Sequence, residues 1–216
     1  MYETILFDLD GTLIDSAEGI KNSFRYTFDK FGLPEPTDEY LNIFIGPPLL
    51  YSFEGILGFP HEKAVHAVEV YREYFSEKGV FENYLYGGIV TLLQKLKSDG
   101  KKLIVATSKY ELYALQILEN LGIMQYFDFA AGSLKDGGRG TKAEVISYVL
   151  DKCGITDLVS AVMVGDRMHD TEGAKKVGID SIGVTFGFGT RKELEAHGAT
   201  HIAESAEEIY RIVSGV

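Results

Sequence analysis

The sequence has little cysteine, a deficit of positive charge and no long apolar run. Its one cysteine, Cys153, cannot form an internal disulfide, which excludes a disulfide-stapled domain and predicts a reducing, cytoplasmic location. With 21 basic and 32 acidic residues the net charge is −11, which opposes binding to nucleic-acid polymers or anionic lipids. No run approaches the roughly 20 apolar residues that span a bilayer, and the first residues lack a targeting pattern. We therefore expect no membrane partner.

The composition is that of a globular protein with a sizeable core. Apolar residues make up 45% of the 216 residues and there are only 5 prolines, which excludes a disordered or collagen-like chain. The length lies between one and two typical domains of about 150 residues. A large domain with an insertion fits both observations.

Short apolar runs alternate with helical patterns after residue 87. Four runs fit strands buried on both faces, in addition to a first one at residues 4–7: 103–106, 129–131, 161–164 and 181–184. Helical patterns lie between them at 88–98, 110–120, 142–152 and 170–177, and several end at a glycine. This alternation predicts an α/β class domain with a doubly wound parallel sheet.

Residues 16–82 have a different pattern, because no convincing strand interrupts them. Apolar residues recur there at helical spacing, at Ile20, Phe24, Phe28 and Phe31 and again at Val65, Val68 and Phe75. The segment also holds half of the aromatic residues. We expect a small all-helical unit whose aromatic residues fill its core, rather than a wall of aromatic residues that faces a substrate.

Two acidic pairs follow predicted strands. Asp8 and Asp10 come after the first strand and Asp166 and Asp170 after the strand at 161–164, at the carboxyl ends where ligands bind in such sheets. Carboxylates held close together indicate a bound cation or a shared proton. Asp8 and Asp10 alone would also fit a solvated Asp-Gly turn. Asp170 fits either the N-cap of a helix that begins at Thr171 or a group supporting the metal ligands, and the two roles are compatible.

Two further segments indicate an anion. Thr107, Ser108 and Lys109 follow the strand at 103–106, where we expect hydroxyls and backbone N–H groups at the start of a helix. Thr141 and Glu144 have the spacing of a capping box, which places Lys142 in the first turn of the next helix. A lysine there is unfavourable against the helix dipole unless an anion lies before it, and the same argument applies less strongly to Lys109.

Taken in order along the chain, these motifs resemble the haloacid dehalogenase superfamily of phosphotransferases. The motifs are Asp8-Leu9-Asp10-Gly11-Thr12, Thr107-Ser108-Lys109, Lys142 and the segment from Gly165 to Asp170. The resemblance implies a Rossmann-like core of residues 1–15 and 83–216, with a helical cap of residues 16–82 inserted after the first strand. Within the family, the segments 13–16 and 187–190 are most similar to phosphoglycolate phosphatases, from which Ala143 and Arg167 depart.

The resemblance implies roles for five residues in phosphoryl transfer. Asp8 would be the nucleophile and form an aspartyl-phosphate, and Asp10 would act as general acid and base. Thr107 and Lys142 would be catalytic by holding the phosphoryl group, and Ser108 would also bind phosphate. A second aspartate in the position of Asp10 favours phosphoryl transfer over halide displacement.

The resemblance also implies a Mg²⁺ cofactor. Asp8, the backbone carbonyl of Asp10 and Asp166 would bind the ion, and Asp170 would support them. The expected substrate is a small phosphorylated metabolite, similar to phosphoglycolate, and the expected oligomeric state is a monomer or homodimer.

Several alternatives stay open at this point. A nucleoside monophosphate, as for a 5′-nucleotidase, or pyrophosphate would be a different substrate for the same chemistry. A sugar phosphomutase of the β-phosphoglucomutase type would use the same core residues, and a phospho-accepting signalling module would use similar ones. A nucleotide-binding P-loop is excluded, because the glycine-rich segment 136–142 lacks the Gly-Lys-Ser/Thr ending and reads as a flexible loop before a helix.

Overall fold

The computed structural model describes residues 1–135 and 137–216, which form two compact units. The first comprises Met1–Asp15 and Leu85–Val216, and the second comprises Ser16–Tyr84. Within the described part of the second unit no strand precedes β3 (Tyr84–Leu85), which pairs with β2 (Ile14–Asp15) in a short separate sheet. Residue 136, at the start of the glycine-rich segment, lies outside the described residues.

The first unit contains a six-stranded sheet in the order β5-β4-β1-β6-β7-β8. Its strands are β1 (Thr4–Phe7), β4 (Lys102–Tyr110), β5 (Phe129–Ser133), β6 (Ala161–Gly165), β7 (Asp180–Val184) and β8 (His201–Ala203). Every pairing in this sheet is parallel. The predicted α/β class with a parallel sheet is confirmed, and the chain forms strands where the apolar runs predicted them.

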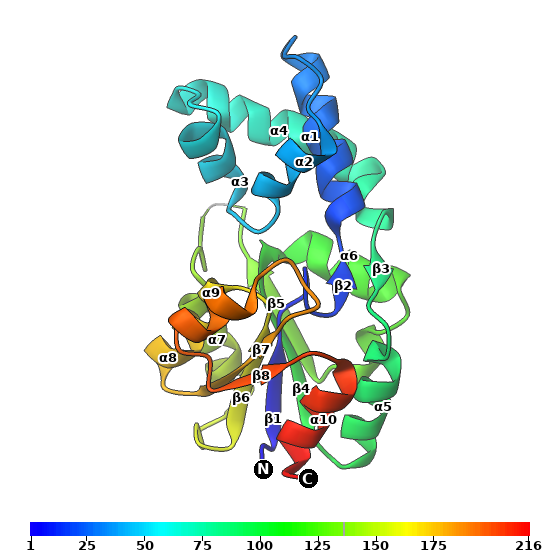
Figure 1. The fold of residues 1–216 in the computed structure, drawn as a ribbon, viewed down its shortest axis with the longest axis vertical. Helices are drawn as coiled ribbons and strands as arrows, with labels where there is room; N and C mark the ends of the chain where they lie inside the picture. Colours follow the sequence, from blue (N-terminus) through cyan, green and yellow to red (C-terminus); the bar gives the residue numbers. More distant parts are fainter. Residues whose placement is uncertain (136) are drawn as a thin grey trace. The chain divides into compact units, whose positions relative to one another are not determined.

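Helices cover both faces of this sheet (Figure 1). The helices of the first unit are α5 (Ile89–Ser98), α6 (Glu111–Asn120), η4 (Met124–Tyr126), α7 (Lys142–Lys152), α8 (Met168–Val177), α9 (Arg191–Ala196) and α10 (Ala206–Ser214). Helices α7 and α8 pack against each other on one face, and α5 and α10 pack against each other on the opposite face. A parallel sheet buried on both sides needs apolar strands, which explains why these strands read as continuous apolar runs.

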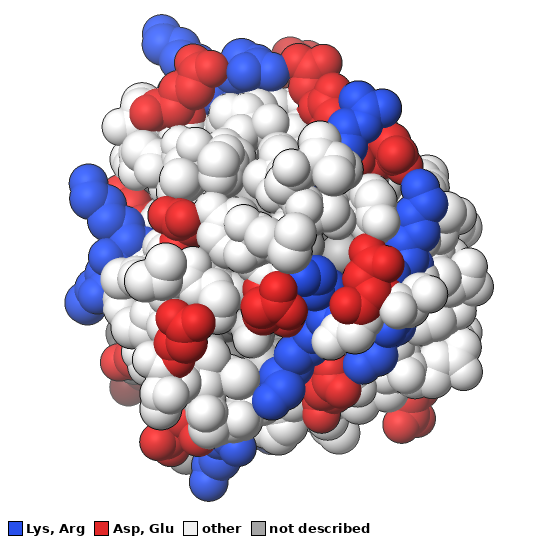
Figure 2. Space-filling view, turned by 90° about the horizontal axis from the view of Figure 1, so that it is seen from below, with Lys and Arg blue, Asp and Glu red and all other residues white. Residues whose placement is uncertain are grey.

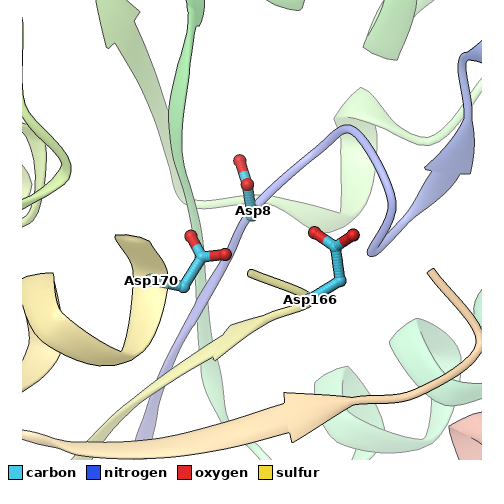
Figure 3. Close-up of side chains that lie close together, drawn as sticks. All are labelled: Asp8, Asp166 and Asp170. Carbon is cyan, nitrogen blue, oxygen red and sulfur yellow. The ribbon is translucent and has the colours of Figure 1, made fainter. Parts of the chain in front are cut away.

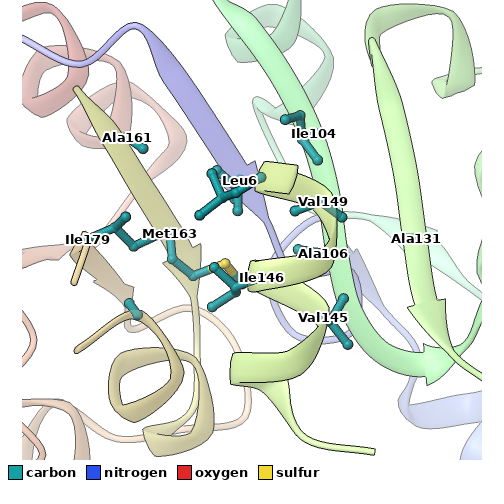
Figure 4. Close-up of a cluster of buried hydrophobic side chains, with 12 residues drawn as sticks. Leu6, Ile104, Ala106, Ala131, Val145, Ile146, Val149, Ala161, Met163 and Ile179 are labelled. Atoms are coloured by element: carbon teal, nitrogen blue, oxygen red, sulfur yellow. The ribbon is translucent and has the colours of Figure 1, made fainter. Parts of the chain in front are cut away.

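Aliphatic side chains fill the space between the sheet and helix α7. Leu6 and Met163 from the strands meet Val145, Ile146 and Val149 from the helix, and all five are fully buried (Figure 4). Burial of this apolar surface holds α7 on the sheet. The first residue of α7 is thereby fixed at the carboxyl edge of the strands.

The second unit is helical, as the sequence predicts. Its elements are α1 (Ala17–Lys30), α2 (Asp38–Leu41), η1 (Asn42–Phe44), α3 (Leu49–Tyr51), η2 (Ser52–Ile56), α4 (His61–Glu77) and η3 (Gly79–Phe81). Phe24 is fully buried and its ring centroid lies 4.4 Å from that of Phe44 and 5.3 Å from that of Phe53. The aromatic residues at the centre of this unit therefore pack against one another, as we expect from its small size.

One predicted helix face in this unit is only partly right, because Phe75 is buried but Val65 is not. Helix α4 buries Ala64, Ala67, Val70 and Tyr71 besides Phe75, whereas Val65 is 41% exposed. The apolar spacing favoured the larger valines, whereas the face that α4 buries includes two alanines.

Charged residues of both signs are interspersed on the face of the molecule seen from below (Figure 2). No single-sign basic patch covers this face, in line with the overall charge of −11. None of the described helices combines the length and apolarity needed to cross a bilayer.

Candidate active site

Asp8 lies at the carboxyl edge of the sheet, directly after β1. Phe7 is in register with Val105 of β4 and with Val164 of β6. The backbone N–H of Asp8 donates to the carbonyl of Val164 at 2.9 Å, which continues the sheet pairing by one residue. Because parallel strands end at the same edge, the residues that follow β4 and β6 come close to Asp8.

Three carboxylates converge at this edge. Asp8, Asp166 and Asp170 each offer an oxygen, and these oxygens all lie within 4.8 Å of one another. Figure 3 shows Asp8 after β1, Asp166 after β6 and Asp170 on α8, with their carboxyl groups gathered together. Asp166 and Asp170 are each only 1% exposed and Asp8 is 9% exposed. The structure thus brings together three of the four acidic residues that the sequence singled out.

Glycines make room for Asp166. A Cβ at Gly11 would lie 2.1 Å from Oδ2 of Asp166, and one at Gly189 would lie 1.8 Å from its backbone carbonyl oxygen. Gly11 also has a φ of +76°, in the left-handed region that favours glycine. Phe188 donates its backbone N–H to Oδ2 of Asp166 at 2.7 Å. Segment 187–189 therefore encloses Asp166, a role that the sequence analysis did not assign to it.

Lys142 is the first residue of α7, as predicted. Thr141 accepts from the backbone N–H of Glu144, whose side chain accepts from the backbone N–H of Thr141, so the capping box is present. The Nζ atom of Lys142 lies 2.8 Å from Oδ1 of Asp8 and 2.8 Å from Oδ1 of Asp170. Its side chain is only 3% exposed, so Lys142 is not a solvated surface lysine.

Lys142 also donates to the carbonyl of Ala106 at 3.1 Å, which ties α7 to β4 at the residue where the register of this strand begins to shift. Burial by itself would lower the pKa of Lys142, but the carboxylates of Asp170 and Asp8 outweigh burial and raise it. The two carboxylates therefore favour the charged ammonium form of Lys142. Gly173 of α8 allows its close approach, since a Cβ there would lie 2.9 Å from Cγ of Lys142.

The negative charge of this cluster exceeds its positive charge. Burial raises the pKa of Asp166, and the charges of Asp170 and Asp8 raise it further. Burial likewise raises the pKa of Asp8, against the opposing effect of Lys142. Asp166 takes part in no ion pair within residues 1–135 and 137–216. Such carboxylates favour a bound cation, which would replace the missing positive charge.

The segment Thr107–Lys109 does not lie at a helix start, so that expectation is wrong. Strand β4 continues to Tyr110 with a shift of register between Ala106 and Tyr110, and α6 begins only at Glu111. Thr107 is 1% exposed and its hydroxyl hydrogen-bonds with Asp8, whereas Ser108 is exposed. The irregular strand end, rather than a helix N-terminus, brings Thr107 to the site.

Asp10 is not part of the three-carboxylate cluster and pairs with Lys109. The Nζ atom of Lys109 donates to both carboxylate oxygens of Asp10, at 2.9 and 3.0 Å. The side chain of Lys109 is 8% exposed and that of Asp10 is 24% exposed. The sequence pattern favoured Lys109 less strongly than Lys142 and did not connect Lys109 with Asp10. The register shift in β4 that brings Lys109 to Asp10 leaves no recognisable pattern in the sequence.

Asp170 is not the N-cap of its helix. Helix α8 begins at Met168, two residues before Asp170, and Oδ2 of Asp170 accepts from the backbone N–H of Arg167 at 3.1 Å. Arg167 itself donates from Nε to Glu193 of α9 at 2.9 Å. Asp170 thus secures the first turn of α8 with one oxygen and contacts Lys142 with the other.

Chemically, the site offers a carboxylate beside a buried ammonium group, with further carboxylates that could bind a divalent cation. A carboxylate can attack phosphorus and form a covalent intermediate when positive charge offsets the repulsion between the two anions. The backbone and hydroxyl donors around Asp8 are of the kind that hold phosphoryl oxygens.

The chain is similar to known proteins in sequence and in structure. Residues 5–184 match the haloacid dehalogenase-like hydrolases. The chain is 44% identical to a 5′-nucleotidase of Pseudomonas aeruginosa over 93% of this chain and 90% of the relative. It is 39% identical to the tyrosine-protein kinase PtkA of Mycobacterium tuberculosis over 94% of this chain and 69% of the relative. A crystal structure of a predicted phosphatase from Clostridium acetobutylicum superposes with a TM-score of 0.94, at 44% identity and with all of both chains covered.

Proposed function

Because the chain belongs to the haloacid dehalogenase-like hydrolases and is a phosphatase, we propose that it hydrolyses a small phosphomonoester through an aspartyl-phosphate on Asp8. The observation that carries this proposal is the contact between Asp8 and Lys142, 2.8 Å apart at the carboxyl edge of the sheet. It pairs a nucleophile with the cation that a phosphoryl dianion requires.

We propose that Mg²⁺ is the cofactor, because the donor set fits it. Magnesium prefers carboxylate and carbonyl oxygens, and Asp8, Asp166 and the backbone carbonyl of Asp10 would hold it. The excess of negative charge around Asp166 supports a divalent cation, while Asp170 is already engaged by Lys142 and by the N–H of Arg167. When bound, the ion supplies positive charge to the phosphoryl oxygens.

In the first step, an oxygen of Asp8 attacks the phosphorus, and the bond to the ester oxygen breaks. Lys142 and the hydroxyl of Thr107 hold the phosphoryl oxygens, with Ser108 as a further donor. Asp10 delivers a proton to the departing alcohol. In the second step, Asp10 takes a proton from a water molecule that attacks the phosphorus, and the bond to Asp8 breaks to release inorganic phosphate.

We propose that residues 16–84 act as a cap that excludes bulk water during these steps and selects the leaving group. A phosphoglycolate-like metabolite is the primary substrate candidate. A nucleoside monophosphate is the second, favoured by the 44% identical relative that is named a 5′-nucleotidase. The aromatic residues of the second unit add little to this choice, because Phe24, Phe44 and Phe53 are buried in its own core.

The test is phosphate release from phosphoglycolate, nucleoside monophosphates, sugar phosphates and pyrophosphate, with Mg²⁺ and with a chelator. Release that depends on Mg²⁺ from at least one phosphomonoester supports the proposal. Conversion of a sugar phosphate to its isomer without free phosphate would identify a mutase. A stable phosphoprotein without turnover would identify a signalling module.

A further inference from the structure

We infer that Lys109 is a positioning residue that holds Asp10 for the second step, the hydrolysis of the aspartyl-phosphate. This inference rests on the function proposed above. Lys109 contacts both oxygens of Asp10, at 2.9 and 3.0 Å, and its side chain is 8% exposed. The two contacts fix both the position and the orientation of the Asp10 carboxylate.

The backbone of β4 is shaped to place this lysine. The strand shifts register between Ala106 and Tyr110, and irregularities of this kind redirect side chains next to active sites. The N–H of Lys109 donates to Oγ1 of Thr107 at 3.2 Å, which fixes the turn of the chain. A Cβ at Gly132 of β5 would lie 2.3 Å from the carbonyl oxygen of Lys109, so the neighbouring strand accommodates Lys109 only because residue 132 is a glycine.

The two lysines of the site contact different carboxylates. Lys142 contacts Asp8 and Asp170, and Lys109 contacts Asp10. The lysine that contacts the nucleophile serves formation of the phosphoenzyme. The lysine that contacts the acid/base serves its breakdown, in which a water oxygen bonds to phosphorus, the bond to Asp8 breaks and the water proton passes to Asp10.

The substitution Lys109→Met tests this with p-nitrophenyl phosphate and Mg²⁺. Nitrophenolate leaves without protonation, so the first step does not need Asp10 as an acid and the second step limits turnover. We expect kcat to fall about 10- to 100-fold, as for a misplaced catalytic group, with KM changed less than about threefold. A burst of one nitrophenolate per enzyme and trapped aspartyl-phosphate should accompany the loss.

Controls separate positioning from structure. Lys109→Arg should recover most of kcat, and Lys109→Met should cause no further loss in an Asp10→Asn background, because the two residues act together. Lys95→Met is the matched control, since Lys95 is a partly exposed lysine paired with Glu207 away from the site. Gly132→Ala should give a weaker form of the same kinetic change by displacing the backbone of Lys109, and it tests the inference if Lys109→Met does not fold.

A raised KM with unchanged kcat would overturn the inference and assign Lys109 to substrate binding. A lower kcat without accumulation of phosphoenzyme, or an equal further loss in the Asp10→Asn background, would also overturn it. Failure of the proposed function gives a different result, since the unmodified protein would then form no phosphoenzyme and release no phosphate.

Discussion

The two units of the chain bury different kinds of polar side chain. The second unit buries only uncharged ones, Ser16, Ser23, Thr27, Ser52 and Asn83, among its described residues. The first unit buries Asp8, Lys142, Asp166 and Asp170 together at one edge of its sheet, and Lys101, which pairs with Glu3, elsewhere.

This difference follows from the cost of burying charge. An uncharged hydroxyl is satisfied by the nearest carbonyl, as Ser23 is by Gly19 at 2.7 Å. A buried charge needs a partner of opposite sign. A buried ion pair also indicates a role other than stability, because well-packed apolar residues in its place would usually make the protein at least as stable. Buried charge therefore separates the unit that carries the chemistry from the unit whose interior serves packing.

The largest expected effect is on activity when Asp8 is replaced. Asp8→Asn removes the proposed nucleophile and should reduce Mg²⁺-dependent phosphate release by about 10³-fold or more. The fold should persist, because burial already opposes the charged form of Asp8 and raises its pKa. Phosphate assays and thermal unfolding measure both effects, and unchanged turnover would remove Asp8 as the nucleophile.

Replacement of Lys142 should affect activity and stability together. Lys142→Met leaves Asp8 and Asp170 without their shared cation, and loss of one partner of a buried ion pair costs about 3–5 kcal/mol. We also expect phosphate release to fall about 100-fold or more. Urea unfolding and steady-state kinetics measure the two losses. A stable, active Lys142→Met variant would show that buried charge in this unit is not tied to the chemistry.

Replacement of a core aromatic residue in the second unit should mainly lower the stability of the protein. Phe24→Ala removes a fully buried ring packed on Phe44 and Phe53 and should cost about 3–5 kcal/mol. Urea unfolding measures this cost, and Val65→Ala on the exposed face of α4 is the control. A loss below about 1 kcal/mol would contradict a tightly packed aromatic core.

The smallest expected effect concerns a surface charge of the first unit. Burial opposes ionisation of Asp128, but the N–H of Leu103 and the ammonium of Lys97 outweigh it and lower the pKa of Asp128 in the folded protein. The stabilisation is therefore present at neutral pH and disappears as the pH falls below about 4. Because Asp128 is partly exposed, Asp128→Asn should cost less than about 1 kcal/mol near pH 7.

Unfolding of both proteins at pH 7 and pH 3 checks this prediction. The difference in free energy of unfolding should shrink at pH 3, and a difference that grows as the pH falls would show that the sign is wrong.

Local patterns predicted many elements of the first unit closely, although they gave no prediction for β8, α9 and α10. The apolar runs at 161–164 and 181–184 became β6 and β7, and the helix at 142–152 begins and ends where its capping box and following glycine predict. These features depend on neighbours in the sequence, so the sequence contains the information. The start of α8 was missed by three residues, because Arg167, not Asp170, occupies its N-cap position.

The contacts within the site depend on residues distant in the chain. No spacing in the sequence predicts that Lys142 lies between Asp8 and Asp170, or that Lys109 reaches Asp10 across the bend in β4. The buried face of α4 was likewise predicted only in part, because Phe75 is buried but Val65 is exposed. Such features arise only when the strands and helices pack together.

The sequence by itself determined the fold class, the helical nature of the inserted unit and the membership of Asp8 and Asp166 at one edge of a parallel sheet. Apolar periodicity and the shared direction of parallel strands are sufficient for these conclusions. Only the tertiary structure decided which cation contacts which carboxylate, because that depends on side-chain reach, burial and the absence of a Cβ at Gly11, Gly132 and Gly189. Ion pairs form over a few ångströms, and only folding brings residues that are distant in the sequence to such short distances.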